Sequence, residues 1–476
     1  MSTEPLLRVS SVQVEGLFDQ FDHRVDLEPN ERVTILHGPN GVGKTMLLRM
    51  VNDLLRGRYN LFLKVPFRRF ALTLTDGSGI DLAISHPSQA TVGPSKKLKL
   101  SLLENGKQKE PYEFSSSNDV LSRMEEALAP HMEVLEPHME ALTSHMKAMG
   151  PFMKMARPYM EELVSRGEVP ASQAEALRLA HKWLTTGEIN DLMDTEQDRM
   201  HSELKWLKVL RDSVAVHLID TQRLLRPSAA YPSSDQAKPR TIHRVLDDAR
   251  DLYVRINDTM ARYGQQSQRL DQSFPQRLLT SPPPTLSVDD LKTRMEELDS
   301  KRAGLKKIGL LDKLEDHPFD PTTLDSIEPA SQGVMSLYVQ DTSDKLEVLT
   351  DLARRTRLLL DNVNHKFLHK RIRIDREAGL VAERDDGTSL ELEALSSGEQ
   401  HELVLHYDLL FRVRPNTLVL IDEPELSLHV AWQKRFLPDL LKIVATAKFD
   451  VLMATHSPYI VGDRSDLMIG LGEDPA

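Results

Sequence analysis

The sequence predicts an α/β fold in two separated parts, with a mainly helical segment between them. A glycine-rich stretch at 37–45 follows a short apolar run and precedes a helical pattern, which is the strand–loop–helix order of a phosphate-binding loop. A second apolar run, 417–421, ends in two carboxylates, as a buried parallel strand does at a site. From about 119 to 364 the pattern is helical and broken by prolines. We therefore expect one phosphate-binding unit that is formed by residues before and after the helical segment.

Composition restricts the class of protein. The chain has 476 residues, of which 40% are hydrophobic and 28% charged, a normal balance for a globular core. The absence of cysteine excludes disulfides and thiolate-bound metals and agrees with a cytoplasmic location. We see no leader-like start and no apolar run long enough to span a bilayer, so we expect no membrane partner. The net charge of -12 disfavours general polyanion binding, although nucleic acid remains a candidate partner through a local basic stretch at Arg354, Arg355 and Arg357.

The glycine-rich stretch has the chemistry of a nucleotide site. Its glycines allow backbone N–H groups to turn toward an anion, Lys44 adds a positive charge for the β- and γ-phosphates, and the Thr45 hydroxyl can ligate Mg²⁺. An ordinary glycine turn is the alternative, and the spacing of the glycines, lysine and threonine disfavours it. The predicted nucleotide-binding residues are Gly38, Pro39, Asn40, Gly41, Val42, Gly43, Lys44 and Thr45.

The end of the chain supplies candidate catalytic groups. Asp422 is expected to hold Mg²⁺, directly or through water, and Glu423 to accept a proton from the attacking water. His456 follows the apolar strand 450–454 and can contact a γ-phosphate or that water, a structural histidine being the alternative. Upstream, Ser396 to Glu399 open a helix and make a possible anion site, for which a simple N-cap is the alternative.

We expect three regions along the chain. Residues 1–115 alternate as strands around one helix and form a β-rich first lobe, with a hairpin whose turn is Asp76–Gly79. Residues 116–368 form a helical insertion that offers a partner or oligomer surface, and Ser281–Pro284 is its clearest break. Residues 369–476 return to strands and form a second α/β lobe.

A seven-residue repeat lies within the insertion. Pro-His-Met and related triplets recur from 130 to 160, and apolar residues from 132 to 163 occupy the seam positions of a heptad pattern. The prolines conflict with one straight helix. A seam within the chain or between two copies is favoured over an adaptable partner surface. Successive histidines at 131, 138 and 145 would lie about 10 Å apart on a helix, too far to share one metal ion.

In this order, the motifs resemble the ABC-type ATPase heads of the SMC, RecF and OLD families. By that resemblance, Gly38–Thr45 is the Walker A loop, Leu420–Glu423 is Walker B with Glu423 as the catalytic glutamate, and His456 is the switch histidine. Leu395–Glu399 resembles the signature motif of these families, but has a serine at the position where the first glycine of the motif is usual. The resemblance implies a split head, ATP and Mg²⁺ as ligands, and a homodimer or higher oligomer. The signature of one chain would then cap the ATP of another through Ser396, Ser397, Gly398 and Glu399.

The same resemblance implies two further site roles. A glutamine that assists the metal is assigned to Gln89, with Gln108 as its rival. Phe18 or Phe21 could stack on adenine, although core packing is favoured for both.

A narrower resemblance concerns Ile421–His429, Trp432–Gln433 and Thr455–Pro458. These segments look like those of the ATPases of bacterial anti-phage defence systems, namely Septu, PARIS, Gabija and the OLD nucleases. The resemblance implies an ATP-hydrolysing scaffold or sensor that controls a separate, nuclease-like effector, since only residues 457–476 follow the histidine. The alternative is a RecF- or SMC-like ATPase of DNA repair or recombination. A transporter ATPase is disfavoured by the serine in the signature and by the large insertion.

Overall fold

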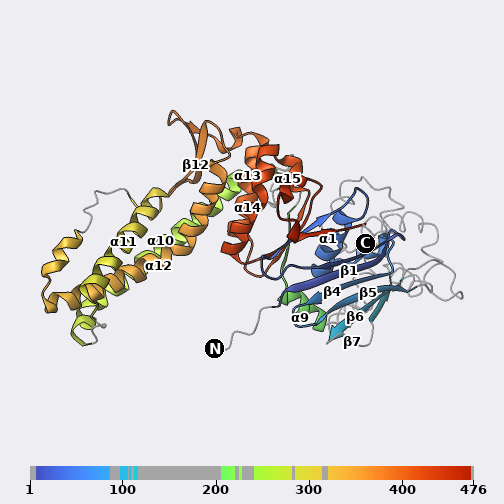
Figure 1. Cartoon of the computed structure of the whole chain (residues 1–476), viewed down its shortest axis with the longest axis horizontal. Coiled ribbons are helices and arrows are strands. Elements are labelled where there is room, and N and C mark those ends of the chain that lie inside the picture. Colours follow the sequence, from blue (N-terminus) through green and yellow to red (C-terminus); the bar gives the residue numbers. More distant parts are fainter. Residues whose placement is uncertain are drawn as a thin grey trace, which may run out of the picture. The chain divides into compact units, whose positions relative to one another are not determined.

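The structure is a computed structural model of the chain. It describes residues 7–85, 97–104, 107–108, 112–115, 205–219, 225–227, 241–280, 285–312 and 320–472. The chain divides into two compact units (Figure 1), which we describe separately. Unit 1 comprises Met1–Ser10, Val25–Asn52 and Ala215–Ala476, and unit 2 comprises Ser11–Arg24 and Asp53–Val214. Gln89 and the repeat at 130–163 lie outside the described residues, so both remain predictions.

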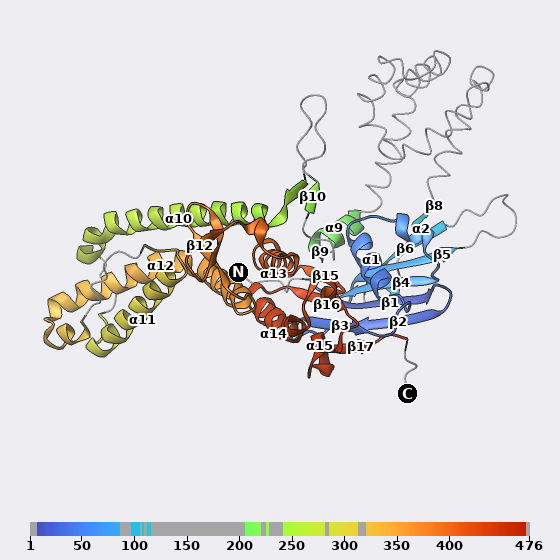
Figure 2. The ribbon, with the colours of Figure 1, turned by 90° about the horizontal axis from the view of Figure 1, so that it is seen from above.

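A five-stranded parallel sheet forms the core of unit 1, and β3, β16 and β15 lie next to one another in it (Figure 2). Buried apolar residues make up most of β3, β15 and β16, as expected for strands covered on both faces. Asp422 and Leu36 both align with Ala454, so the three strands end at the same level. The predicted α/β fold is thus confirmed. The sheet order is β17 (Met468–Gly470), β3 (Val33–His37), β16 (Asp450–Ala454), β15 (Leu418–Asp422) and β9 (Val216–Ile219).

The strand β9 differs from expectation, because it comes from the stretch predicted as a helical insertion. It pairs in parallel with β15, and Leu418 N donates to Ala215 O at 2.8 Å just before the two strands pair. Four residues are too few to distinguish a strand from a helix by hydrophobic periodicity. Only the pairing with β15 identifies this segment as part of the sheet.

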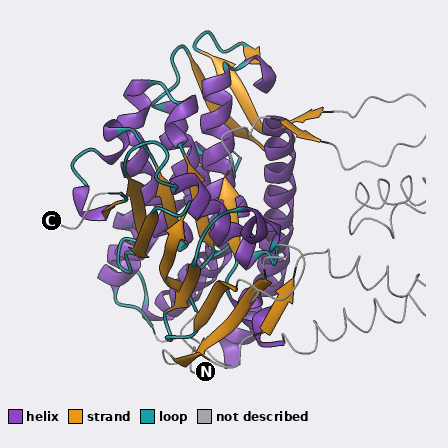
Figure 3. Ribbon diagram, turned by 90° about the vertical axis from the view of Figure 1, so that its right-hand side faces the viewer, coloured by secondary structure: helices purple, strands orange, loops and turns teal. Residues whose placement is uncertain are grey.

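Helices pack against this sheet, as the purple and orange ribbons of Figure 3 show. A π-helical turn, η6 (Asp408–Arg412), continues the helix α13. The 3₁₀ turns of this region are short connections. The helices are α1 (Lys44–Leu55), α13 (Ser397–Tyr407), α14 (Val430–Ala447) and α15 (Pro458–Val461), and the 3₁₀ turns are η5 (Leu392–Ala394), η7 (Pro424–Ser427) and η8 (Ser465–Leu467).

Three long helices, α10 (Arg244–Thr280), α11 (Val288–Lys307) and α12 (Pro329–Asn364), form most of the described part of the insertion. Both α10 and α11 pack along α12. The break predicted at Ser281–Pro284 lies outside the described residues, but α10 ends at Thr280 and α11 begins at Val288, where the Ser287 side chain caps the helix. A 3₁₀ turn, η4 (Pro321–Ser326), precedes α12.

Small antiparallel pairings complete unit 1. The strands β12 (Lys370–Asp375), β13 (Gly379–Arg384) and β14 (Ser389–Leu390) form one sheet, and β10 (Leu225–Pro227) pairs with β11 (Thr241–His243). One continuous apolar core reaches from the central sheet to the long helices, and includes Val419, Leu252, Leu298 and Leu349. The sheet and the three insertion helices therefore share a single packed interior.

Unit 2 is built on a seven-stranded sheet. Its described helices are α2 (Asn60–Lys64) and α9 (Lys205–Ser213). The hairpin predicted around Asp76–Gly79 is present as β4 and β5. The sheet order is β2 (Phe21–Asp26), β1 (Val9–Leu17), β4 (Arg69–Leu74), β5 (Gly79–Ser85), β6 (Lys97–Glu104) and β7 (Lys107–Gln108), with β8 (Tyr112–Ser115) also paired to β6.

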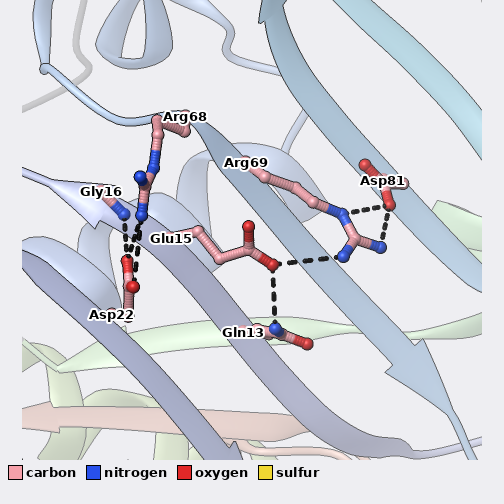
Figure 4. A network of polar contacts seen from close by, with 7 residues as sticks. All are labelled: Gln13, Glu15, Gly16, Asp22, Arg68, Arg69 and Asp81. Carbon is pink, nitrogen blue, oxygen red and sulfur yellow. Dashed lines mark hydrogen bonds and ion pairs between the residues drawn. The ribbon is translucent and has the colours of Figure 1, made fainter.

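Polar contacts tie three strands of this sheet together (Figure 4). Arg69 donates to the buried carboxylate of Asp81 at 2.7 Å and also contacts Glu15 at 3.3 Å, so it joins β4 to β5 and to β1. Nearby, Asp22 accepts from Gly16 N at 2.6 Å and from Arg68 at 2.9 Å. The contacts of Arg69 pair the buried carboxylate of Asp81 with a cation. We assign this group of contacts to stabilisation of the fold rather than to a functional site.

No helix in the described ranges is both long enough and apolar enough to cross a membrane.

Candidate nucleotide-binding site

The glycine-rich loop connects β3 to α1 within unit 1. Leu47 N donates to Gly43 O at 2.8 Å, so the first helical turn follows directly from the loop. Gly38 adopts φ +152°, and a Cβ there would overlap the carbonyl oxygen of Leu471. By contrast, a Cβ at Gly41 would meet no atom within 4 Å. The loop therefore needs glycine at its first position for packing, whereas at Gly41 the requirement is only for a positive φ, here +89°.

Lys44 is buried, with only 5% of its surface exposed. Its Nζ donates to Gly38 O at 2.8 Å and to Pro39 O at 2.9 Å, and lies 3.4 Å from Nδ1 of His456. Burial lowers the pKa of Lys44, and the carboxylates of Glu423, Asp422 and Glu425 oppose that effect. The ammonium group is thus held inside the loop, where it faces three acidic groups.

Thr45 and Asp422 meet at the start of α1. The Thr45 hydroxyl donates to Oδ1 of Asp422 at 3.0 Å, although the two residues are 377 positions apart. Hydroxyl and carboxylate oxygens are the ligands that Mg²⁺ prefers. The convergence of these two oxygens fits a magnesium site.

Glu423 follows β15 in a left-handed conformation, with φ 43° and ψ 60°. Such a conformation is uncommon for a residue with a Cβ and is concentrated at functional sites. Glu423 N donates to Ala454 O at 2.9 Å, which extends the pairing of β15 with β16 by one residue. Its Oε1 lies 3.6 Å from Nε2 of His456. The turn therefore aims the carboxylate across the strand ends toward the histidine.

Five of the predicted site residues are brought together in this way: Lys44, Thr45, Asp422, Glu423 and His456. They come from the carboxyl ends of three adjacent parallel strands, β3, β15 and β16, which is the usual position of a site in an α/β sheet.

The predicted signature residues occupy a separate position at the start of α13. Ser396 and Glu399 form a capping box, in which Glu399 Oε2 accepts from Ser396 N and Ser396 Oγ, both at 2.8 Å. Lys370 donates to the same carboxylate at 3.0 Å. Burial acts to raise the pKa of Glu399, but these hydrogen bonds outweigh it and lower the pKa. Ser396 and Ser397 are exposed, so their surface is accessible to another molecule.

Sequence reasoning missed a buried charge cluster behind α13. Lys366 and Glu402 have side chains that are 1% and 0% exposed, and Lys366 Nζ lies 3.0 Å from Glu402 Oε1 and 3.1 Å from Asp439 Oδ2. Burial acts to raise the pKa of Glu402, but His406 and Lys366 lower it to about 2. The cluster joins the end of α12 to α13 and α14. No periodic pattern could have revealed it, because Lys366 lies in the turn after α12 and its partners Glu402 and Asp439 are isolated charges on α13 and α14.

A second cluster surrounds the π-helical turn. Asp408 accepts from Arg244 of α10 at 2.7 and 2.6 Å, and Arg412 lies 2.5 Å from Asp248. Burial raises the pKa of Asp248 to about 8, against the opposing effect of Arg412. Arg355 of α12 also donates to Leu410 O. The helix that begins at Ser396 is therefore bound at its far end to α10 and α12.

The remaining site predictions fall in unit 2. Gln108 is in β7 of unit 2, and the structure does not describe its side chain. Phe18 and Phe21 belong to unit 2 and are partly buried, and Phe21 stacks on His23 with ring centres 5.8 Å apart.

The second half of the chain matches a known protein family. The family model described as "AAA domain, putative AbiEii toxin, Type IV TA system" matches residues 264–462, less than half of the chain. The match includes the signature segment, Asp422, Glu423 and His456, but not the glycine-rich loop. The comparison with curated proteins finds no match.

Solved structures give low similarity over almost the whole chain. One is the Smc head domain with an extended coiled coil bound to the C-terminal domain of ScpA, from Pyrococcus furiosus, with 11% identity, TM-score 0.32, and coverage of 98% of this chain and 93% of that one. Another is the SmcHead bound to the C-winged helix domain of ScpA, with 9% identity, TM-score 0.30, and coverage of 97% and 93%. Similarity of this degree carries no information about partners. The fold, the loop and the family match agree on an ATP-binding domain of the P-loop ATPase type.

Proposed function

We propose that this chain hydrolyses ATP with Mg²⁺ and that ATP joins the heads of two copies. The observation that carries the proposal is the convergence of Lys44 and Thr45 with Asp422, Glu423 and His456 at the ends of three parallel strands. Phosphoryl transfer depends mainly on positioning and on neutralising charge, which is what a lysine, metal-binding oxygens and a carboxylate provide.

Each residue has a role in this proposal. Lys44 and the loop amides hold the β- and γ-phosphates, and Thr45 and Asp422 hold the metal. Glu423 orients the attacking water and accepts its proton, and His456 donates to the γ-phosphate or to that water. Bound Mg²⁺ would supply charge neutralisation at the phosphate oxygens.

The second copy supplies the signature. Ser396 and Ser397 are exposed at the N-terminus of α13, where backbone N–H groups and the helix dipole favour an anion. The side chains of Lys44 and Thr45 instead contact the loop, His456 and Asp422. We therefore assign Ser396, Ser397, Gly398 and Glu399 to the ATP held by a partner head.

The biological role is the finer part of the proposal. We propose an ATP-dependent subunit of a bacterial anti-phage defence system that controls a separate effector, and the toxin-linked description of the matching family supports it. In this scheme 1–115 and 369–476 are the head, and 116–368 is the surface for the effector or for further copies.

A DNA-repair ATPase is the second candidate. The packed helices α10 and α12, of 37 and 36 residues, favour it because an arm of paired helices suits such proteins. Against it, Arg354 and Arg355 of the basic stretch both pair with Asp351. Strong stimulation of ATP hydrolysis by DNA would select the repair function. Co-purification with a nuclease-like product of a neighbouring gene would select defence.

Association is tested by measuring the mass of the particle in solution. Glu423→Gln protein should shift to a larger species on addition of ATP and Mg²⁺, because it binds ATP without hydrolysing it. Lys44→Ala protein should stay unchanged. Adding Gly398→Asp to the Glu423→Gln protein should abolish the shift while ATP binding is retained, since the new carboxylate would face the partner's phosphates. A shift in the Lys44→Ala protein would refute ATP-dependent association.

A further inference from the structure

Glu425 lies in the η7 turn, two residues after the predicted catalytic glutamate, and reaches the turn that carries His456. Its Oε1 accepts three hydrogen bonds: from Thr455 Oγ1 at 2.8 Å, from His456 N at 2.7 Å and from Ser457 N at 3.2 Å. One carboxylate oxygen therefore fixes three consecutive residues of the turn after β16.

Gln433 of α14 makes a second connection between the same two turns. Its Nε2 donates to Leu428 O at 3.1 Å, and its Oε1 accepts from Ser457 Oγ at 2.7 Å. Ser457 N also lies 3.0 Å from Thr455 Oγ1. The turn after β15 and the turn after β16 are thus locked together by side chains as well as by the strand pairing.

The other oxygen of Glu425 is in an unusual environment. Oε2 is buried and accepts no hydrogen bond from the described residues. Leaving a buried carboxylate oxygen without a donor costs free energy, which the three bonds to Oε1 offset. The negative charge also acts on Lys44, since Glu425 is one of the three carboxylates that oppose the lowering of its pKa.

These contacts determine where the His456 imidazole lies. Its Nδ1 is 3.4 Å from Lys44 Nζ and its Nε2 is 3.6 Å from Glu423 Oε1, so the ring spans the gap between them. The backbone N–H of His456, next to the Cα that carries the ring, donates to Glu425. A shift of the turn by about 1 Å would separate the ring from both partners, and misplacement of this size costs about 10²-fold in rate.

We propose that Glu425 is the positioning residue of this site: it holds the turn Thr455–Ser457 so that His456 stands between Lys44 and Glu423. The catalytic consequence rests on the proposed ATPase function. Glu425 acts through the backbone N–H of His456, to which its Oε1 is bonded, and not on the imidazole ring directly. The sequence pattern places Glu425 only next to Walker B, with no indication of this contact.

Two substitutions of equal length separate the hydrogen-bond acceptor from the bulk of the side chain. Glu425→Gln keeps an acceptor oxygen for the three donors, whereas Glu425→Met keeps the length and removes the acceptor. We expect Glu425→Met to lower kcat about 100-fold with KM for ATP and the affinity for ATP unchanged within about threefold. Glu425→Gln should retain kcat within about tenfold, because neutral acceptors make weaker bonds than charged ones. Thr455→Val, which removes one of three donors, should fall between wild type and Glu425→Met.

Amide hydrogen exchange gives a readout that does not depend on hydrolysis. The amides of His456 and Ser457 should exchange at least tenfold faster in Glu425→Met than in wild type, and close to wild type in Glu425→Gln. If wild-type protein binds ATP without hydrolysing it, the proposed ATPase function fails, and the exchange rates alone decide the positioning role.

The proposal is overturned by wild-type kcat in Glu425→Met, by a loss of kcat without faster exchange at these two amides, or by a parallel loss of ATP affinity. Thermal melting of each variant shows whether it is folded. If Glu425→Met is unfolded, Glu425→Gln and Thr455→Val carry the test, and wild-type exchange in Thr455→Val then overturns the proposal.

Discussion

Thr45 Oγ1 donates a 3.0 Å hydrogen bond to Asp422 Oδ1, so the two expected metal ligands already touch in the folded chain. This contact joins the first turn of α1 to the end of β15. It makes the metal site a property of the tertiary structure rather than of either segment.

Removing the hydroxyl should weaken magnesium binding. We expect Thr45→Val to raise the Mg²⁺ concentration needed for half-maximal nucleotide binding or hydrolysis by at least about tenfold. The reason is that even a residue that only hydrogen-bonds to a metal ligand contributes about 10–100-fold to metal affinity. Thr45→Ser keeps the hydroxyl and should stay near wild type. A magnesium titration of the three proteins checks this, and identical requirements would contradict the assignment.

The first loop glycine should tolerate no side chain. Gly38→Ala places a Cβ against Leu471 O at φ +152°, so the loop or the strand β17 must shift. We expect it to abolish ATP binding and to lower the free energy of unfolding by more than about 1 kcal/mol. Gly41→Ala meets open space and is the matched control, with only the cost of its positive φ. Calorimetric melting and nucleotide titration distinguish the two, and equal effects would show that the close approach to Leu471 is unimportant.

Two lysines that share a partner should differ strongly in their contributions to stability. Lys366 is 1% exposed and pairs with Glu402 and Asp439, whereas Lys442 is 59% exposed and pairs with Asp439 at 3.5 Å. Lys366→Met should destabilise by about 3–5 kcal/mol, because two buried carboxylates lose their cation. Lys442→Met should cost at most about 1 kcal/mol. Denaturant titration measures both, and a small effect of Lys366→Met would mean that the carboxylates find other compensation.

The pKa of Asp248 predicts a pH dependence of stability. Burial raises it to about 8 from an ordinary value of 3.8, so the folded state keeps a proton that the unfolded state loses between these values. Stability from this group therefore falls as pH rises from about 4 to 8. Asp248→Asn should remove this fall, and its melting temperature relative to wild type should increase between pH 5 and pH 8. The Asp408→Asn protein, which loses the partner of Arg244, should be less stable than wild type at both pH values.

Much of the site could be predicted from local sequence. The loop at 37–45, the carboxylates at Asp422 and Glu423, and the strand before His456 each have short-range patterns with a physical meaning. Parallel strands end at one edge of a sheet, and the structure places Lys44 beside His456, Thr45 beside Asp422 and His456 beside Glu423 at that edge. A boundary near Ser281–Pro284 could also be predicted, because consecutive prolines disfavour a helix, and α10 ends at Thr280.

Other features could not be read from the sequence. The strand β9 is too short to show a period, and only its pairing with β15 defines it. In the sequence, Glu425 is one more acidic residue after Asp422 and Glu423. Its hydrogen bonds to Thr455, His456 and Ser457 form only because the turn after β16 lies beside it. A lysine such as Lys366 would ordinarily be assigned to the surface, yet its side chain is only 1% exposed and pairs with Glu402 and Asp439.

The sequence by itself therefore determined the phosphate-binding loop and the acidic strand end, because each depends on residues that are neighbours in the chain. The tertiary structure decided which of these groups act together. Lys44 and His456 are 412 positions apart, and only the order of strands in the sheet places Nζ 3.4 Å from Nδ1. Distances between side chains on different strands depend on pairing and register, which no local pattern specifies.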